Sequence, residues 1–266
     1  MNKLAHIKGI LFDLDGVLYV GSKRIDGAIE AISSIRNSAI KCRFITNTST
    51  LSRESLKQKL DKLGFNIMPK EIISAPQAAK IYLRKFADPV CYLLLAEDVK
   101  HDFSTFKQSA KQADFVIIGD IGDSWSYALL NDVFNLLVNG AELIAIHKSR
   151  FWQTEHGLQM DIGAFITALE YASGKSAVII GKPSQDFFQM ALNDMLLAAN
   201  EVAIIGDDID SDIGGGQHAG LIGVLVKTGK YRKEYTANSA VVPDLVLDSI
   251  ADLVKHIPSV TTSGGD

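Results

Sequence analysis

The chain has 266 residues, a length that suggests one large domain or two modest ones. Its composition, 47% hydrophobic and 22% charged with 21 Gly and only 6 Pro, excludes a disordered or collagen-like protein. Because 27 Lys and Arg face 31 Asp and Glu, the formal charge is -4, and no general positive field favours nucleic acid or an anionic membrane as a partner.

Cysteine usage and the apolar runs indicate the compartment. Cys42 and Cys91 lie far apart and outside any C-x-x-C pair, which argues against a disulfide framework or a zinc cluster. The apolar run that Asp13 ends is too short for a secretion signal or a membrane span, and no later run reaches about 18 residues. We therefore expect a cytoplasmic protein.

Short apolar runs alternate with segments of helical periodicity. The runs predict buried strands at 7–12, 42–45, 90–95, 115–118, 143–146, 177–180, 202–205 and 221–226. One of the helices is expected at 125–138, with Tyr127, Leu130, Phe134 and Leu137 on one face. The alternation predicts an α/β protein with mainly parallel strands, and the tail from residue 260 is expected to fray.

The first strand ends in Asp13-Leu-Asp15-Gly16, which places two carboxylates at one spot. Polar residues at the carboxyl end of a parallel strand point into the crevice where α/β proteins bind ligands. Asp13 could then act as a nucleophile and Asp15 as an acid and base, while Gly16 lets the backbone turn away. The alternative interpretation is a turn with two solvated aspartates.

Two further strand ends carry groups suited to an anion. Thr46 and Asn47 follow the second strand, where a hydroxyl and backbone amides can bind an oxyanion. Lys182 follows the strand at 177–180 and offers a point charge. Ordinary helix capping and a surface lysine are the corresponding alternatives.

Four aspartates crowd the end of the strand at 202–205, namely Asp207, Asp208, Asp210 and Asp212. At 4 Å and an effective dielectric constant of 20, two like charges repel by about 4 kcal/mol. A hard cation such as Mg²⁺ would relieve this repulsion. The alternative is an acidic, solvated loop.

The four strand-end motifs, in this order, resemble those of the haloacid dehalogenase superfamily. The chain resembles still more closely its N-acetylglucosamine-phosphate phosphatase-like subfamily, in which a larger cap is inserted between the second and third motifs. The segments 143–150, 165–172 and 225–231 resemble those of individual haloacid dehalogenase-like phosphatases. The resemblance covers nearly the whole chain. It implies a doubly wound, Rossmann-like parallel-sheet core at 1–75 and 177–266, with an inserted α/β cap at 76–176.

The resemblance also implies a role for each motif residue. Asp13 would attack phosphorus, and Asp15 would protonate the leaving group and then activate water. Mg²⁺ would be bound by Asp13, the Asp15 carbonyl and Asp207, with Asp208 or Asp212 holding its water ligands. The phosphate site would be completed by Lys182, Thr46 and Asn47.

His147 and Lys148 of the cap are candidates for binding the leaving group, with a solvated strand end as the alternative. The sequence thus predicts a Mg²⁺-dependent phosphatase of small phosphorylated metabolites, and the resemblance makes a homodimer plausible. A phosphotransferase or mutase on the same scaffold and a non-catalytic phospho-ligand-binding protein are the alternatives.

Overall fold

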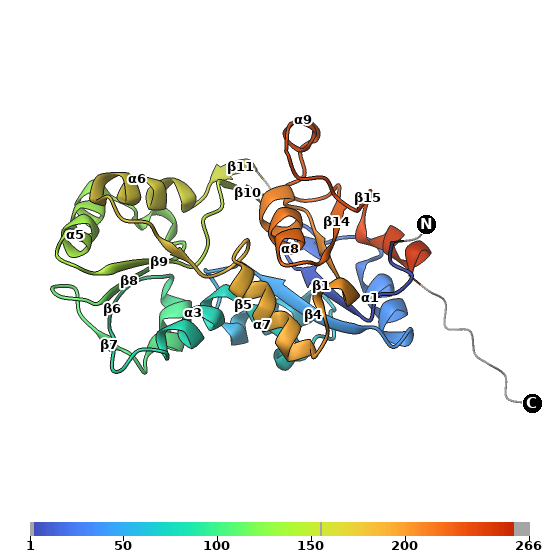
Figure 1. The fold of residues 1–266 in the computed structure, drawn as a ribbon, viewed down its shortest axis with the longest axis horizontal. Coiled ribbons are helices and arrows are strands. Elements are labelled where there is room, and N and C mark those ends of the chain that lie inside the picture. The colour runs from blue at the N-terminus through green and yellow to red at the C-terminus, as the bar shows by residue number, and fades with distance from the viewer. Residues whose placement is uncertain (1–2, 155, 258–266) are drawn as a thin grey trace, which may run out of the picture. The chain divides into compact units, whose positions relative to one another are not determined.

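The computed structural model describes residues 3–154 and 156–257 (Figure 1). It divides the chain into two compact units, the first formed by residues 1–45, 63–65 and 188–266, and the second by 46–62 and 66–187. These limits differ from the predicted limits of the cap at 76 and 176, so the assignment of a core and a cap stays a prediction. The tail that is expected to fray from residue 260 lies outside the described residues.

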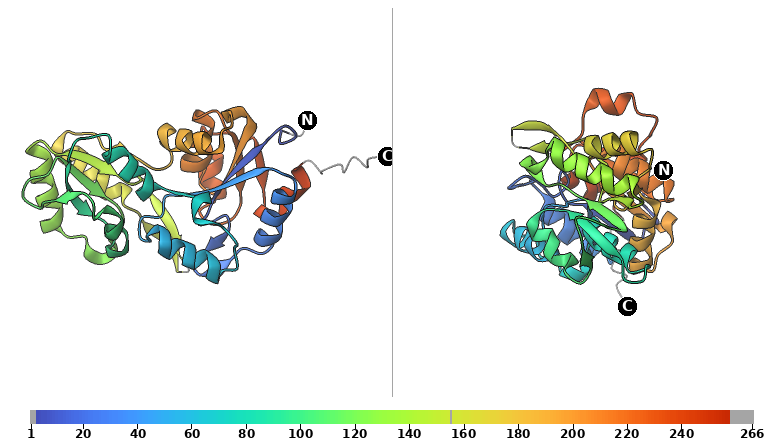
Figure 2. Two further views of the ribbon diagram at one scale, coloured as in Figure 1. Left: turned by 90° about the horizontal axis from the view of Figure 1, so that it is seen from below. Right: turned by 90° about the vertical axis from the view of Figure 1, so that its left-hand side faces the viewer.

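The first unit is built on a parallel sheet whose strands follow the order β15-β14-β13-β1-β4 (Figures 1 and 2). The strands are β1 (Gly9–Asp13), β4 (Lys41–Thr46), β13 (Val202–Gly206), β14 (Ile222–Val226) and β15 (Leu245–Leu247). Every residue of β1 and β13 is buried, which explains their continuous apolar sequence. The rings of Phe12 and Phe44 stack between neighbouring strands, with centroids 5.5 Å apart.

Helices and a small hairpin complete the first unit. The helices that lie wholly or mainly in it are α1 (Ala28–Asn37), α7 (Gln185–Met195), α8 (Gly215–His218) and α9 (Lys233–Ala237). The hairpin pairs β2 (Tyr19–Val20) with β3 (Lys23–Arg24). Short non-α turns are η4 (Ala199–Glu201), η5 (Ile209–Gly214), a π-helical turn, and η6 (Ile250–His256). The apolar face of α1, with Ala31, Ile32 and Ile35, is buried, and α1 contacts η6.

The order in which the chain adds strands to this sheet reverses at β1, so that later strands lie on both sides of it. The next strand of this sheet along the chain, β4, lies on one side of β1, whereas β13, β14 and β15 follow one another on the other side. Ligands of open α/β sheets bind at the carboxyl ends of the strands at such a reversal. The parallel register pairs Phe12 with Ile205, so β1 and β13 end side by side. The predicted α/β class with a doubly wound parallel sheet is confirmed.

The second unit contains its own parallel sheet, drawn mainly in green in Figure 2. Its strand order is β12-β9-β8-β6-β7. These strands are β6 (Val90–Leu94), β7 (Lys107–Gln108), β8 (Phe115–Ile118), β9 (Glu142–Ala145) and β12 (Val178–Ile179). Its remaining strands are β5 (Ile72–Ser74) and the antiparallel hairpin of β10 (Phe151–Thr154) and β11 (Gly157–Met160). The strand predicted at 177–180 therefore belongs to the same sheet as the strand predicted at 143–146.

Helices of the second unit are α2 (Arg53–Lys62), α3 (Ala75–Leu83), α4 (Glu97–Lys100), α5 (Tyr127–Val138) and α6 (Gly163–Ser173), with the turns η1 (Pro69–Glu71), η2 (His101–Phe103) and η3 (Gly122–Ser124). Of the four residues expected on one face of α5, Tyr127, where the helix begins, is 85% exposed. The residues that α5 buries are Val133, Leu136 and Leu137. Within residues 3–154 and 156–257, no helix is both long and apolar enough to span a membrane.

Candidate active site

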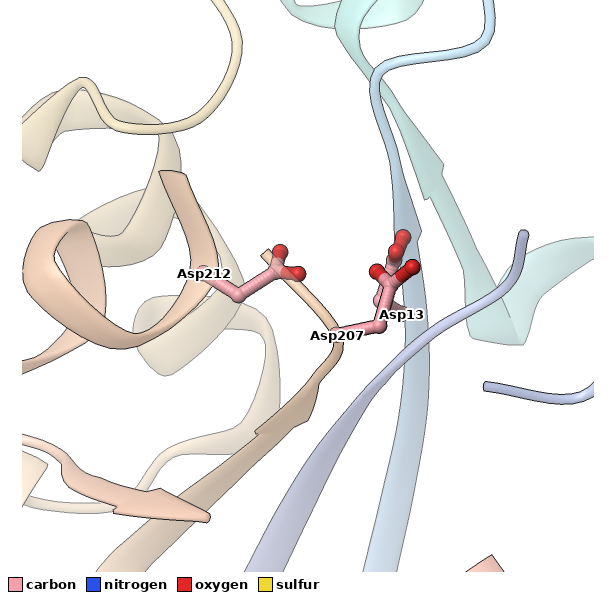
Figure 3. Close-up of side chains that lie close together, drawn as sticks. All are labelled: Asp13, Asp207 and Asp212. Carbon is pink, nitrogen blue, oxygen red and sulfur yellow. The ribbon is translucent and has the colours of Figure 1, made fainter. Parts of the chain in front are cut away.

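Three buried aspartates of the first unit come together at the carboxyl ends of β1 and β13 (Figure 3). Asp13 is the last residue of β1, Asp207 follows β13, and Asp212 lies in the π-helical turn η5. One carboxylate oxygen from each lies within 4.8 Å of the others, and the Asp212 carboxylate points toward the other two. We call this group the acidic cluster. The sequence placed Asp13 and Asp207 at strand ends, and the family resemblance implied one metal site formed by both with the Asp15 carbonyl and with Asp208 or Asp212.

Electrostatics disfavours three charges in the acidic cluster without a counter-ion. Burial raises the pKa of Asp207 well above its ordinary value, and the charges of Asp13 and Asp212 raise it further. Asp207 Oδ2 accepts a hydrogen bond of 2.6 Å from the Lys230 amide, while Oδ1 is buried and has no hydrogen-bond partner among the described residues. A hard cation that prefers carboxylate oxygens would satisfy Oδ1 and offset the repulsion, so the residues present fit Mg²⁺.

Asp15 lies in the tight turn that directly follows β1. The Gly16 amide donates to the Tyr19 carbonyl at 2.6 Å, and the Leu18 amide donates to the Leu14 carbonyl at 2.9 Å. Burial raises the pKa of the Tyr19 phenol well above its ordinary value, and the charges of Asp15 and Asp13 raise it further. The negative charges of Asp13 and Asp15 therefore both disfavour ionisation of the buried Tyr19 phenol. Sequence reasoning missed Tyr19, although it stands four residues after Asp15.

The structure separates the two candidates for holding metal-bound water. Asp208 Oδ1 accepts hydrogen bonds of 3.0 Å from the amides of Asp210 and Ser211, and so caps η5. Burial raises the pKa of Asp208, but the Lys230 ammonium, 3.5 Å away, and the capping hydrogen bonds lower it on balance. Asp212 instead belongs to the acidic cluster and accepts a 3.1 Å hydrogen bond from the Asp208 amide.

The predicted phosphate-binding residues lie together in the second unit. The Asn47 amide group donates to the Lys182 carbonyl at 2.9 Å, and the Lys182 amide donates back to Asn47 Oδ1 at 2.9 Å. Thr46 and Lys182 are buried, and Thr46 Oγ1 accepts a 3.0 Å hydrogen bond from the Thr48 amide. These two residues, 135 positions apart, are thereby held against each other.

The two cap candidates differ in their surroundings. His147 is buried, with Nδ1 3.9 Å from Asp161 Oδ2 and 3.4 Å from the Ser149 amide. Lys148 donates to Glu170 of α6, and Glu170 also accepts a hydrogen bond of 2.9 Å from the Ala177 amide just before β12. Lys148 therefore takes part in holding α6 to the start of β12, and its role toward a substrate stays a prediction.

The contact between Lys148 and Glu170 predicts a pH-dependent contribution to stability. Burial raises the pKa of Glu170, but hydrogen bonds from Lys148 and Ala177 and the Lys148 charge lower it below its ordinary value of 4.5. Because the folded-state pKa is the lower one, the stabilisation is present above pH 4.5 and is lost as pH falls through the folded-state value. We expect Glu170→Gln to lower the free energy of unfolding by about 1–2 kcal/mol at pH 7.

Urea unfolding of wild type and Glu170→Gln, compared at pH 7 and at successively lower pH, tests this expectation. The difference in unfolding free energy should shrink as the pH falls below 4.5. The exposed Lys107–Asp88 ion pair supplies the control, because Asp88→Asn should change stability by less than about 0.5 kcal/mol. A difference for Glu170→Gln that is independent of pH would contradict the assigned cause.

Comparisons with known proteins agree with these motifs. Residues 10–107 match the family described as haloacid dehalogenase-like hydrolase, and residues 179–253 match the family described as HAD-hydrolase-like. The chain is 38% identical to human haloacid dehalogenase-like hydrolase domain-containing protein 2, over 94% of this chain and 96% of that protein. It is 37% identical to human phospholysine phosphohistidine inorganic pyrophosphate phosphatase, over 95% of this chain and 94% of that protein.

The fold comparison points to the same subfamily. NagD from E. coli K-12 superposes with a TM-score of 0.81 at 25% identity, over 92% of this chain and 98% of NagD. The predicted resemblance to the N-acetylglucosamine-phosphate phosphatase-like subfamily, and with it the prediction of an enzyme, is confirmed. From its motifs, its fold and these matches, the chain belongs to the haloacid dehalogenase-like hydrolase family.

Proposed function

We propose that this protein is a Mg²⁺-dependent phosphatase of small phosphorylated metabolites, which reacts through an aspartyl phosphate on Asp13. The observation that carries the proposal is the acidic cluster, in which Asp13 lies buried beside Asp207 and Asp212 at the carboxyl ends of β1 and β13. One relative named above is itself named a phosphatase, which supports this chemistry for a member of the same family.

Asp13, the Asp15 carbonyl and Asp207 would hold Mg²⁺, and Asp212 would hold its water ligands. When bound there, the cation supplies positive charge that offsets the repulsion between a carboxylate and a phosphate dianion. The capping hydrogen bonds of Asp208 favour Asp212 over Asp208 for this role.

The reaction proceeds in two steps on the two carboxylates of the first motif. In the first, a carboxylate oxygen of Asp13 forms a bond to phosphorus, the bond from phosphorus to the leaving oxygen breaks, and Asp15 gives that oxygen a proton. In the second, Asp15 takes a proton from water as the water oxygen bonds to phosphorus, which releases phosphate and restores the Asp13 carboxylate. Asp15 therefore ends the cycle protonated again.

Lys182, Thr46 and Asn47 would bind the oxygens of the phosphoryl group, and His147 and Lys148 would bind the leaving group. The hydrogen bonds between the Asn47 side chain and the Lys182 backbone would preorganise this binding, because they fix the two residues against each other. The small metabolite as substrate, the cytoplasmic location and the homodimer stay predictions.

Phosphate release that depends on the metal is the expected result for the wild-type protein. With excess chelator, release should fall by at least about 100-fold, because repulsion between Asp13 and the phosphate is then not offset, and added Mg²⁺ should restore it. The assay uses a panel of phosphomonoesters, pyrophosphate and phosphoamidates, since one relative is named for phospholysine, phosphohistidine and inorganic pyrophosphate.

Each outcome of this assay separates the proposed function from its alternatives. Metal-dependent release that is absent from Asp13→Asn supports the phosphatase. Transfer of the phosphoryl group to an added acceptor with little free phosphate would favour a phosphotransferase or mutase. Binding of phosphorylated compounds without any turnover would favour a non-catalytic ligand-binding protein.

A further inference from the structure

The loop that follows β14 contacts both the first aspartate motif and the acidic cluster. We call residues 228–230 of this loop the 228–230 loop. The Thr228 hydroxyl donates a hydrogen bond to the Gly16 carbonyl, and the Lys230 amide donates one of 2.6 Å to Asp207 Oδ2. All of these residues belong to the first unit. The loop is thus hydrogen-bonded both to the turn after β1 and to the Asp207 carboxylate after β13.

Gly229 lies where a side chain has no room. Its φ is +53°, and a Cβ there would lie 2.1 Å from Asp207 Oδ2 and 2.4 Å from the Gly16 Cα. Gly16, with φ +90°, faces the same carboxylate, because a Cβ on Gly16 would lie 1.9 Å from Asp207 Oδ2. The two glycines therefore contact the Asp207 carboxylate from the two backbones, and a methyl group on either would displace it.

The surroundings of the 228–230 loop hold it in place. The Tyr231 amide donates to the Thr228 carbonyl at 3.1 Å, and Arg232 Nη1 donates to the Gly229 carbonyl at 3.0 Å. Tyr231 also packs on the apolar group formed by Ile209, Ile213 and Leu225. The Lys230 ammonium lies 3.5 Å from Asp208 Oδ2. The loop is thereby attached to η5, which carries Asp212.

We propose that the 228–230 loop is a positioning device for the Asp207 carboxylate. By engaging Oδ2 through the Lys230 amide, it leaves the buried Oδ1 as the atom available to a cation in the acidic cluster. The affinity for Mg²⁺ then depends on Thr228 and Gly229, which supply no ligand atom themselves. Groups that orient a metal ligand typically contribute 10- to 100-fold to metal affinity. The inference rests on the proposed function, since it requires Mg²⁺ at this cluster.

The test measures the dissociation constant of Mg²⁺ by titration calorimetry on the full chain, at a temperature where each variant is folded. We expect Gly229→Ala to bind Mg²⁺ about 10- to 100-fold more weakly, because the added methyl displaces Asp207. Thr228→Val should weaken binding about three- to tenfold through loss of the hydrogen bond to Gly16. Thr228→Ser, which keeps the hydroxyl, should bind within about twofold of wild type.

Lys227→Met is the matched control. Lys227 precedes the loop and pairs with Asp248 at the surface, at 2.8 Å, so its replacement should leave Mg²⁺ affinity unchanged. Gly229→Ala and Thr228→Val should also recover phosphate release when Mg²⁺ is raised in proportion to the dissociation constant. A variant that is only less stable would not regain phosphate release when Mg²⁺ is raised. Nor would a loss of stability alone explain why Thr228→Ser keeps the Mg²⁺ affinity that Thr228→Val loses.

The outcomes distinguish the inference from the proposed function. Wild type that binds Mg²⁺, with Gly229→Ala and Thr228→Val binding it equally well, would overturn the inference alone. Wild type without Mg²⁺ binding would overturn the proposed function and the inference with it. If Gly229→Ala does not fold, Thr228→Val against Thr228→Ser decides, since both keep the glycine.

Discussion

Replacing Asp13 with Asn is expected to abolish phosphate release, with a loss of at least about 10⁴-fold. An amide cannot form the bond to phosphorus on which both steps depend, and removal of the nucleophile of a covalent hydrolase costs on the order of 10⁶-fold in kcat. The measurement is release of phosphate from the best substrate of the panel at saturating Mg²⁺. Residual activity above about 1% of wild type would rule Asp13 out as the nucleophile.

Two controls test whether the loss of phosphate release comes from the missing nucleophile and not from a disturbed fold. The first is stability without metal, where Asp13→Asn should be at least as stable as wild type, because the charge of Asp13 contributes to raising the pKa of the buried Asp207. The second is Asp210→Asn, which makes the same change at an exposed residue of η5, the turn that carries Asp212. Its activity should stay within about twofold of wild type.

Asp15→Asn is expected to slow turnover of alkyl phosphates by about 10²- to 10⁴-fold, because general acid and base catalysis is lost in both steps. 4-Nitrophenyl phosphate separates the two roles, since its leaving group departs without a proton. With that substrate the first step should remain fast and the second should be slow. We therefore expect a burst of about one nitrophenolate per protein, followed by slow steady release.

Rapid-mixing absorbance and acid trapping of protein-bound phosphate measure this burst. Asp13→Asn is its control, because a protein that cannot form the aspartyl phosphate should give neither burst nor trapped phosphate. Alkyl phosphates should give no burst with Asp15→Asn, since their first step needs the proton. Equal slowing on both substrate types with no trapped phosphate would contradict the roles assigned to Asp15.

The sequence by itself determined eight strands of the two parallel sheets and the motif residues at their ends, but not the shorter strands such as β7 and β15. Strands buried on both faces need apolar side chains throughout. The apolar runs that end at Asp13 and just before Asp207 can therefore be recognised as strands from the sequence alone. Parallel pairing then requires both ends to meet at one edge of a sheet, which is why Asp13 and Asp207 could be predicted to lie together.

Only the tertiary structure decided how the remaining residues are arranged. Asp208 and Asp212 are equivalent candidates in the sequence, but the π-helical turn directs Asp212 into the acidic cluster and leaves Asp208 as its cap. The strand at 177–180 pairs with β9, and its apolar sequence alone does not specify this partner strand. Lys148 contacts Glu170, and the 228–230 loop reaches Asp207, only after distant segments pack. Local patterns report burial and backbone preference, whereas these contacts depend on long-range packing that no single segment encodes.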